Sequence, residues 1–474
     1  MSRDFCFLRP LCPFLRHLLA ALLLFSSFYS NGALADALNV AIAAYERADY
    51  SLALRELNKL SVHPRAQLTL GMMYENGQGI EQDYERALKL YRQAASQGNP
   101  VAQTNLGRMV ELGRGVVPDD AVALSWYRLA AQQGNQRAQT NLAVMLQNGQ
   151  GSAVDLAEAL KWCQLAADQG NARAQTSLAA IYESGVGVPQ DYAQALKWLR
   201  LAAAQKYAKA QASLAAMYVD GRGVVQNIPE AKKWFKLAAA QGNSAAQFAL
   251  GLLYFKPESG EPNYAEAQKW YRLAAAQGLA AAQINLGQMY AYGQGVAQDD
   301  AEAQRWYRMA VAQGGAVAQT NLGYMYANGR GVPQDYAEAL KWYRLAAEQG
   351  YAVAQNNLGT IYENALGQAQ DYALALHWYS QAAQQRYAHA ANNLGLMLAK
   401  GLGGKQDYAR AYLWFSLGAA LQHEDALRHQ ELLAKQMSAP EMALAKSLME
   451  NCRTGNFQEC GALQDLNPNL SAAK

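Results

Sequence analysis

The sequence has little net charge and only five cysteines. Its 474 residues include 41 Lys and Arg against 38 Asp and Glu, which gives a formal net charge of +3. This balance excludes a strong electrostatic field toward nucleic acid. The apolar content, 51% of the chain, comes mostly from Ala and Leu with added Trp and Tyr, a composition that favours packed helices over sheet.

Residues 1–35 differ from the rest of the chain. Three arginines precede an apolar run from Leu18 to Phe28, and Ala33-Leu34-Ala35 follows. A basic head, a short apolar core and an A-x-A site are typical of a secretory signal peptide, and the run is too short to span a bilayer comfortably. We therefore expect cleavage after Ala35 and export, with the periplasm as the destination and secretion or outer-membrane association as alternatives. The three Arg and Asp4 of this segment carry a net charge of +2. Cleavage would therefore lower the net charge of the chain from +3 to about +1.

The mature chain keeps three cysteines, Cys163, Cys452 and Cys460, and the residue after the cleavage site is not a cysteine that could carry a bacterial lipid anchor. An exported protein meets an oxidising compartment, so Cys452 and Cys460 are predicted to close a disulfide loop in the tail, residues 453–474. A metal site at these two thiols is not expected, because no second Cys or His pair stands at ligand spacing.

A period of 36 residues runs through most of the chain. Stepping by 36 from Gly323 meets a small residue each time, without insertion or deletion. The column is Gly71, Gly107, Ala143, Ala179, Ala215, Gly251, Gly287, Gly323, Gly359 and Gly395. All nine tryptophans, from Trp126 to Trp414, share a second column, and the column from Ala87 to Ala411 is alanine in every copy. A fixed period of this length indicates a solenoid of stacked repeats.

Each copy contains two helical patterns joined by a G-x-G turn. Apolar residues recur at helical spacing in 318–327 and again in 336–348. Between them Gly329 is suited to end the first helix in a left-handed conformation, and Asp335 with Glu338 is suited to cap the second as a capping box. A nucleotide-binding loop would stand once, after a strand. The repeated loop is therefore a turn between helices.

The unit AVAQTNLGYMYANGRGVPQDYAEALKWYRLAAEQG, Ala316–Gly350, resembles the Sel-1-like repeat, a relative of the tetratricopeptide repeat. The resemblance implies an all-α, right-handed αα-hairpin superhelical solenoid over residues 64–422. Residues 36–63 resemble a preceding, tetratricopeptide-like hairpin, and residues 423–452 resemble capping helices, with Ser438 and Glu441 in a capping-box pattern. Two departures are the replacement of the G-x-G turn by FKPESGEPNY after Gly251 and of a turn glycine by Ala365.

Catalytic motifs are absent from the sequence. None of the histidines forms H-E-x-x-H, and the only S-x-x-K considered, Ser471–Lys474, is the end of a polar tail with no S-D-N or K-T-G partner. Some cysteine-rich members of the resembled family are described as penicillin-binding or β-lactamase-like, but they carry cysteine pairs in each repeat, which this chain does not. We expect no enzyme activity, no metal and no cofactor.

The outward positions of the first helices change character in the sixth copy. Using Thr320, Tyr324, Ala327 and Asn328 to mark these positions, the earlier copies have mostly small or polar residues. Large apolar residues then appear at the same positions: Phe248, Leu252, Phe255, Ile284, Tyr292 and Tyr324. These six residues are predicted to bind a partner. The alternative is that Phe248 and Phe255 pack against the irregular loop 256–263.

The resemblance implies an exported scaffold or adaptor that binds other proteins, of the envelope or of a host, in envelope assembly, signalling or host contact. Binding of cell-wall polysaccharide is one alternative, because aromatic grooves suit sugar faces. A penicillin-binding or β-lactamase-like hydrolase is the other. The basic positions of the second helices, such as Lys269 and Lys341, follow a Glu by three residues and are expected to form a solvated face with no role in binding nucleic acid.

Overall fold

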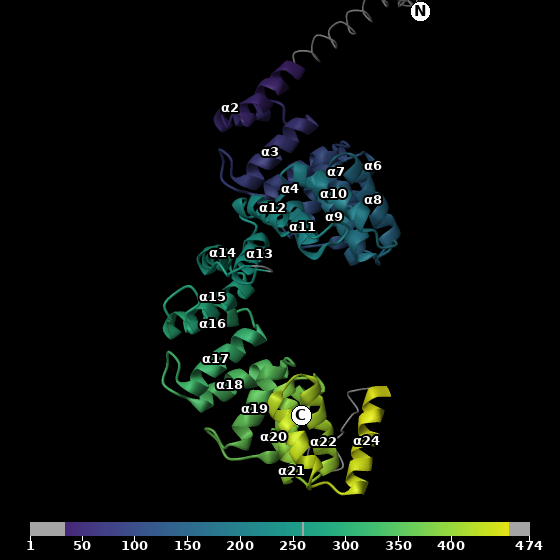
Figure 1. Ribbon diagram of the computed structural model, residues 1–474. Coiled ribbons are helices and arrows are strands. Elements are labelled where there is room, and N and C mark those ends of the chain that lie inside the picture. Colours follow the sequence, from purple (N-terminus) through teal and green to yellow (C-terminus); the bar gives the residue numbers. More distant parts are fainter. Residues whose placement is uncertain (1–33, 258–259, 455–474) are drawn as a thin grey trace, which may run out of the picture. The chain divides into compact units, whose positions relative to one another are not determined.

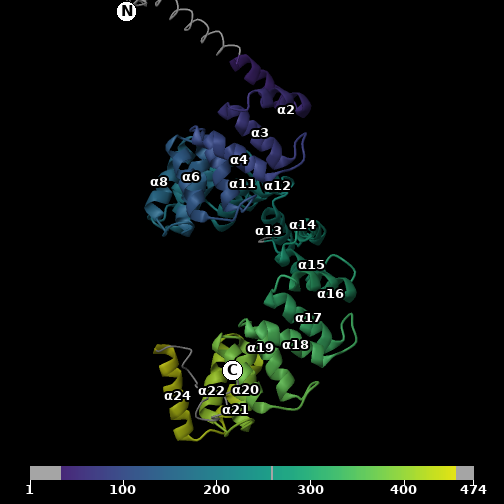
Figure 2. The ribbon, with the colours of Figure 1, turned by 180° about the vertical axis from the view of Figure 1, so that it is seen from behind.

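The computed structural model describes residues 34–257 and 260–454, and these contain helices, turns and no strand. The chain divides into two compact units, Met1–Trp234 and Phe235–Lys474, with the boundary inside helix α12 (Ile228–Ala240). We refer to them as unit 1 and unit 2 and describe each by itself (Figures 1 and 2).

Unit 1 begins with a helix at residues 34–46 and α2 (Tyr50–Lys59). Paired helices follow, one pair for each 36-residue repeat. The first helices are α3 (Pro64–Asn76), α5 (Pro100–Glu111), α7 (Gln136–Asn148), α9 (Ala172–Ser184) and α11 (Ala208–Asp220). The second helices are α4 (Tyr84–Ser96), α6 (Asp120–Gln132), α8 (Leu156–Asp168), α10 (Tyr192–Ala204) and the start of α12.

Unit 2 continues the same alternation. Its first helices are α13 (Ser244–Phe255), α15 (Ala280–Tyr292), α17 (Ala316–Asn328), α19 (Ala352–Glu363) and α21 (Ala388–Lys400). Its second helices are α14 (Tyr264–Ala276), α16 (Asp300–Val311), α18 (Tyr336–Glu348), α20 (Tyr372–Gln384) and α22 (Tyr408–Ala420). Two further helices, α23 (Glu424–Ala434) and α24 (Ala439–Thr454), pack on α22. The predicted fold class, an all-α hairpin solenoid, is confirmed.

The core of each hairpin is a small residue of the first helix facing a ring of the second. Gly107 faces Tyr127 in unit 1, and Gly323 faces Tyr343 in unit 2. The tyrosines are almost fully buried, and the alanine column around Ala339 has no exposed surface. The tryptophans are mostly half-buried at the edge of this core, although Trp198 and Trp414 are buried. Since one hairpin cannot cover such rings alone, stacking of neighbours stabilises each repeat.

Two glycines shape the turn between the helices, as predicted. Gly329 ends α17 at a φ of 63°, a left-handed conformation that costs glycine no Cβ clash. Gly331 is also left-handed, and a Cβ added there would lie 2.7 Å from the backbone oxygen of Asp300. The turn therefore packs directly on the start of α16 in the preceding repeat. Ala365 adopts the left-handed conformation at a φ of 53° in place of a glycine.

The caps of the second helices differ in one detail from the prediction. The Asp335 carboxylate accepts hydrogen bonds from the backbone N–H groups of Ala337 and Glu338, at 2.9 and 3.0 Å. Glu338 does not complete a capping box, because its carboxylate pairs with Lys341 and the Asp335 N–H donates to the Tyr326 carbonyl. The capping box at α24 does form, since Glu441 accepts from both the N–H and the hydroxyl of Ser438.

A buried glutamine occupies the same position of nine first helices, where the tenth has Ala391, and the helical pattern did not predict its burial. Gln103 of α5 donates from Nε2 to the Ala95 carbonyl at the end of α4, and its Oε1 accepts from Gln133 at 2.8 Å. Two glutamines thirty residues apart form the same hydrogen bond in other repeats, for example Gln319 with Gln349. A buried amide whose two ends are both bonded fixes the packing without leaving an unsatisfied polar group.

Candidate partner-binding surfaces

Each first helix has a stripe that the core does not cover. In α9 the residues Ala174, Gln175, Thr176, Leu178 and Ala179 are buried. The four residues on the uncovered stripe are Arg173, Ser177, Ala180 and Glu183, of which Arg173 and Ala180 are exposed and the others half-buried. We call these four positions, with their equivalents in the other first helices, the first-helix face.

The first-helix face of unit 1 contains a cavity of about 340 Å³. Its wall includes Val144 and Gln147 of α7, Arg173, Ser177 and Glu183 of α9, and Lys209 of α11, with Leu199 and Tyr207 beside them. The cavity therefore spans three consecutive repeats and combines apolar, amide, hydroxyl and charged side chains. Such a lining suits a polypeptide segment better than a purely apolar ligand.

Basic side chains mark one end of this face. Arg137, Arg173 and Lys209 are each the second residue of their helix, and all three are exposed. Arg173 donates to the Asn141 side chain at 2.9 Å. Within residues 34–257 and 260–454, no carboxylate pairs with any of the three. Their charges add to the positive ends of the helix dipoles.

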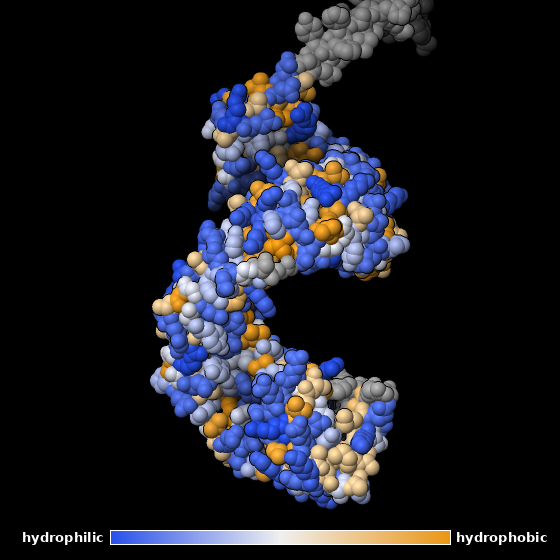
Figure 3. Space-filling model, viewed as in Figure 1, coloured by the Kyte–Doolittle hydropathy of each residue, from blue (hydrophilic) through white to orange (hydrophobic). Residues whose placement is uncertain are grey.

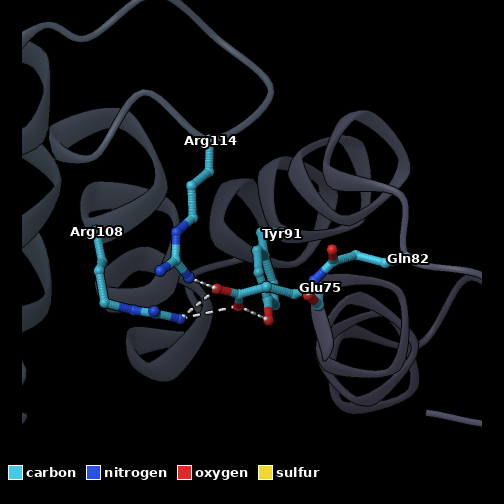
Figure 4. Close-up of polar contacts among 5 residues, drawn as sticks. All are labelled: Glu75, Gln82, Tyr91, Arg108 and Arg114. Carbon is cyan, nitrogen blue, oxygen red and sulfur yellow. Dashed lines mark hydrogen bonds and ion pairs between the residues drawn. The ribbon is translucent and has the colours of Figure 1, made fainter. Parts of the chain in front are cut away.

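Carboxylates at the opposite end of the face are already paired. Glu75 at the end of α3 is 3% exposed and accepts from Arg108 at 2.7 and 2.8 Å and from Arg114 at 3.1 Å (Figure 4). The Tyr91 hydroxyl donates to the same carboxylate at 2.9 Å, and burial with this negative neighbour raises the pKa of Tyr91. Gln82 donates to the Glu75 backbone carbonyl.

The next repeats compensate the equivalent carboxylates in the same way. Tyr127 donates to Glu111 at 2.6 Å, and Arg222 forms an ion pair with Glu183. The Arg114–Glu75 and Arg222–Glu183 pairs each link residues thirty-nine apart, from a turn back to the preceding repeat. These acids of the first-helix face in unit 1 are thus bound by residues of their own repeat or the next one, while its terminal bases remain available.

In unit 2 the structure separates the six predicted partner-binding residues into two groups. Leu252, Tyr292 and Tyr324 are exposed, at 42%, 62% and 43%. They lie on three adjacent first helices, α13, α15 and α17. On the face of the molecule drawn in Figure 3, hydrophobic residues form separate groups among hydrophilic ones. We call these three exposed side chains of successive repeats the apolar surface of unit 2.

The other three predicted residues contact the core. Phe248 lies 5.7 Å from the Tyr271 ring, and Phe255 lies 5.4 Å from Tyr264 and 6.2 Å from Tyr271, measured between ring centroids. Ile284 packs partly against a cluster that includes Tyr307. All three are half-buried. Phe248 and Phe255 are therefore only partly outward, because both rings cover the second helix of their own repeat.

The expectation that Thr320 faces outward is wrong. The Thr320 side chain is buried, at 4% exposure, and its hydroxyl donates to the Ala316 carbonyl one turn earlier. Position 324 of the same helix is exposed. Thr320 and Tyr324 lie on one side of α17, but the core covers the first and not the second. Helical spacing alone therefore does not predict which of the two is exposed.

The basic residues of the second helices form the predicted solvated face. Lys269 and Lys341 pair with the acids three residues earlier, Glu266 and Glu338, both at 3.3 Å. Lys341 also lies 5.4 Å from the centroid of the Trp342 ring, and this pattern recurs along the chain. These charges are locally satisfied, unlike those of Arg137, Arg173 and Lys209.

The described residues offer little for catalysis. They contain no group of three or more His, Cys, Asp or Glu that could hold a metal ion. Burial raises the pKa of the Cys163 thiol to about 12, so this sulfur stays protonated. His423 and His389 contact each other through Nε2 and Nδ1 at 2.9 Å, but His423 also caps α23 by accepting from Ala426. This histidine pair is explained as a structural contact.

Several predicted features lie outside the described residues: the signal peptide up to residue 33, Cys460 and the terminal S-x-x-K segment. Cys452 is in α24. The Cys452–Cys460 disulfide and the cleavage after Ala35 stay predictions. Among the residues that the structure covers, no helix is long and apolar enough to cross a membrane.

The fold and these surfaces define a helical-hairpin repeat protein. Sel1 repeats match ten consecutive segments from residues 64–99 to residues 388–423. The chain belongs to the Sel1 repeat family. Arg137, Arg173 and Lys209 and the apolar surface of unit 2 all lie within the matched repeats.

Solved structures agree. A protective antigen present in uropathogenic Escherichia coli strains, which displays an SLR fold, is 32% identical with a TM-score of 0.71, over 93% of this chain and 96% of that one. A Sel1 repeat protein from Oxalobacter formigenes is 32% identical with a TM-score of 0.52, over 69% of this chain and 94% of that one. A search of curated proteins found no match.

Proposed function

We propose that this chain is an exported scaffold that binds partner proteins through its first-helix face and has no catalytic activity of its own. The Sel1 repeat solenoid is a fold typical of protein-interaction scaffolds. The observation that carries the proposal is the apolar surface of unit 2, where Leu252, Tyr292 and Tyr324 stand in water on three adjacent helices. Large exposed apolar side chains on the first helices of neighbouring repeats are expected of an interface.

Export is proposed on two grounds. The head of the chain has the basic, apolar and A-x-A order of a signal peptide. The similar protein from uropathogenic Escherichia coli is described as a protective antigen, which supports a location accessible to a host. We propose the periplasm or the cell surface as the compartment, and envelope or host proteins as the partners.

The test compares two double variants with matched exposure. Leu252→Ala/Tyr324→Ala removes side chains that are 42% and 43% exposed on first helices. Leu273→Ala/Leu345→Ala removes side chains that are 44% and 40% exposed on second helices. Since an interface anchor contributes about 2 kcal/mol, capture of the native partner should weaken at least about thirtyfold in the first variant and stay unchanged in the second. Equal capture by both variants, with equal melting temperatures, would remove the apolar surface from the function.

A further inference from the structure

The cavity of unit 1 carries a positive charge that nothing in its surroundings neutralises. Arg173 and Lys209 form part of its wall, and Arg137 extends the same row onto α7. Glu183 is the acid in the wall, and it is paired with Arg222. Asp168, at the end of α8, accepts from Gln164 at 2.9 Å. The three bases therefore face solvent with no acid of their own. We call Arg137, Arg173 and Lys209 the basic row.

We propose that this cavity binds an acidic, extended segment of a partner polypeptide, with the carboxylates of the segment on the basic row. The inference rests on the proposed scaffold function and specifies one of its binding sites. Charge complementarity selects an anionic occupant, and each base stands at the second residue of a helix, where the helix dipole further favours negative charge.

The rest of the wall favours a polypeptide over a nucleic acid. Gln147 and Ser177 can exchange hydrogen bonds with a peptide backbone, and Val144 and Leu199 provide apolar contact for its side chains. A nucleic-acid strand needs a groove that is basic along its length. Here the opposite end of α9 carries Glu183 and that of α7 carries Gln147, so the face is not basic along its length. A mature charge near +1 points the same way.

The spacing of the row determines a suitable probe. Helices α9 and α11 contact each other directly, and packed helices lie about 8–10 Å apart. A peptide in the extended polyproline II conformation advances about 3.1 Å for each residue with three residues per turn, so every third side chain returns to the same face about 9 Å further on. A segment with an acid at every third position therefore places successive carboxylates against successive bases of the row.

Unit 2 lacks this feature at equivalent positions. The second residues of α13, α15, α17 and α19 are Ala245, Ala281, Val317 and Val353, and that of α21 is His389, a single imidazole whose pKa is lowered by burial. The positive row is therefore a property of the repeats in unit 1 and not of the fold, and an acidic segment is expected to bind unit 1 alone. Because the turns and core residues at both places follow the same pattern, the difference is not required for folding.

The experiment measures fluorescence polarisation of a labelled synthetic peptide with Glu at every third position and Ser and Ala between, using the full mature chain. A peptide with Gln at those positions is the reference. The acidic peptide should bind more tightly, and its affinity should fall as salt rises. In Arg173→Gln/Lys209→Gln its affinity should fall about tenfold or more, because two charge-assisted contacts are lost. Lys161→Gln/Lys197→Gln, which removes the same charge from the second helices α8 and α10, should bind as the parent does.

Three results would overturn the inference: equal binding of the Glu and Gln peptides, equal losses in the two variants, or tighter binding of a labelled single-stranded DNA of the same charge that depends on Arg173 and Lys209. Circular dichroism of both variants shows that the helices are retained. The scaffold function is tested separately at Leu252 and Tyr324 in unit 2. A parent chain that does not prefer the Glu peptide but captures its partner normally through unit 2 therefore rejects this inference and leaves the proposed function standing.

Discussion

The backbone of Gly323 approaches the Tyr343 ring so closely that an added Cβ would lie 2.8 Å from its Cδ1 and Cε1 atoms. In three repeats the glycine is replaced, by Ala143, Ala179 and Ala215. The facing residue of the second helix is the smaller Cys163 or Leu199 in the first two, and Phe235 in the third, and all three are buried. In two of the three repeats a larger residue on the first helix thus goes with a smaller one on the second, as expected if the two side chains share one volume.

Gly323→Ala should destabilise unit 2 by about 1–3 kcal/mol, because overpacking outweighs the gain of up to about 1 kcal/mol in helix propensity. The cost should shrink by about 1 kcal/mol or more when Tyr343→Leu is already present, since that pair reproduces Ala179 with Leu199. Urea denaturation of both single variants and the double variant measures this coupling. Additive effects would contradict a shared volume. Gly315→Ala is the control, because a Cβ at Gly315 meets no atom within 4 Å.

Glu75→Gln should lower the stability of unit 1 by about 1–3 kcal/mol, because it removes the charge that satisfies Arg108 and Arg114. This figure is below that for a fully buried pair, since the two arginine side chains are 37% and 39% exposed. Glu111→Gln is the matched comparison, with a hydrogen bond from Tyr127 and no ion pair of its own in the described region. Denaturant midpoints should fall further for Glu75→Gln. The reverse order would show that the two arginines contribute nothing.

Unit 2 should lose stability when the pH falls below 6.5. Burial lowers the pKa of His377, His389 and His429 from the ordinary value of 6.5. His423 also lowers the pKa of His389, and Arg428 lowers that of His429. The unfolded chain therefore binds protons first as the pH falls, so this stabilisation is present above 6.5 and lost below it.

Melting temperatures between about pH 7.5 and pH 5.5, a range above carboxylate titration, measure this effect. His389→Gln/His429→Gln should flatten the profile because Gln does not titrate. A parent profile that is flat, or that rises toward acid, would contradict the assignment.

Protein purified from the oxidising compartment should begin at Asp36 and carry a Cys452–Cys460 disulfide. The basis is the signal-like head and the two terminal cysteines of the mature chain. Intact-mass measurement before and after reduction tests both parts. A retained N-terminus would refute cleavage, and an unchanged mass on reduction would refute the disulfide.

The fold could be predicted from the sequence, because the same pattern of residues recurs every 36 positions without a shift in register. The turn at Gly329, the cap at Asp335 and the buried tyrosine column all follow from local rules that act within one hairpin. The buried glutamine column around Gln319 was not identified, because polar residues within a helix are usually taken as exposed. Its regular recurrence was the available signal.

The binding surfaces were harder to predict, because they depend on how far neighbouring side chains cover each residue. Helical spacing placed Thr320 and Phe248 outward with Tyr324. In the structure the threonine bonds back to its own helix and the phenylalanine covers Tyr271. The basic row was not predicted, because the repeated charge pattern lies on the second helices, where bases such as Lys269 and Lys341 pair with acids. Glu183 is the acid beside this row, and the structure pairs it with Arg222. It therefore does not neutralise Arg137, Arg173 or Lys209.

Site-specific photo-crosslinking in intact cells tests the central claim, that the first-helix face binds a partner protein. A photoreactive residue is placed at position 252 or 324 on first helices, and at position 273 or 345 on second helices, where the native side chains have similar exposure. The account predicts that positions 252 and 324 crosslink the same partner and that positions 273 and 345 do not. Crosslinks to that partner from 273 and 345, with none from 252 and 324, would contradict it.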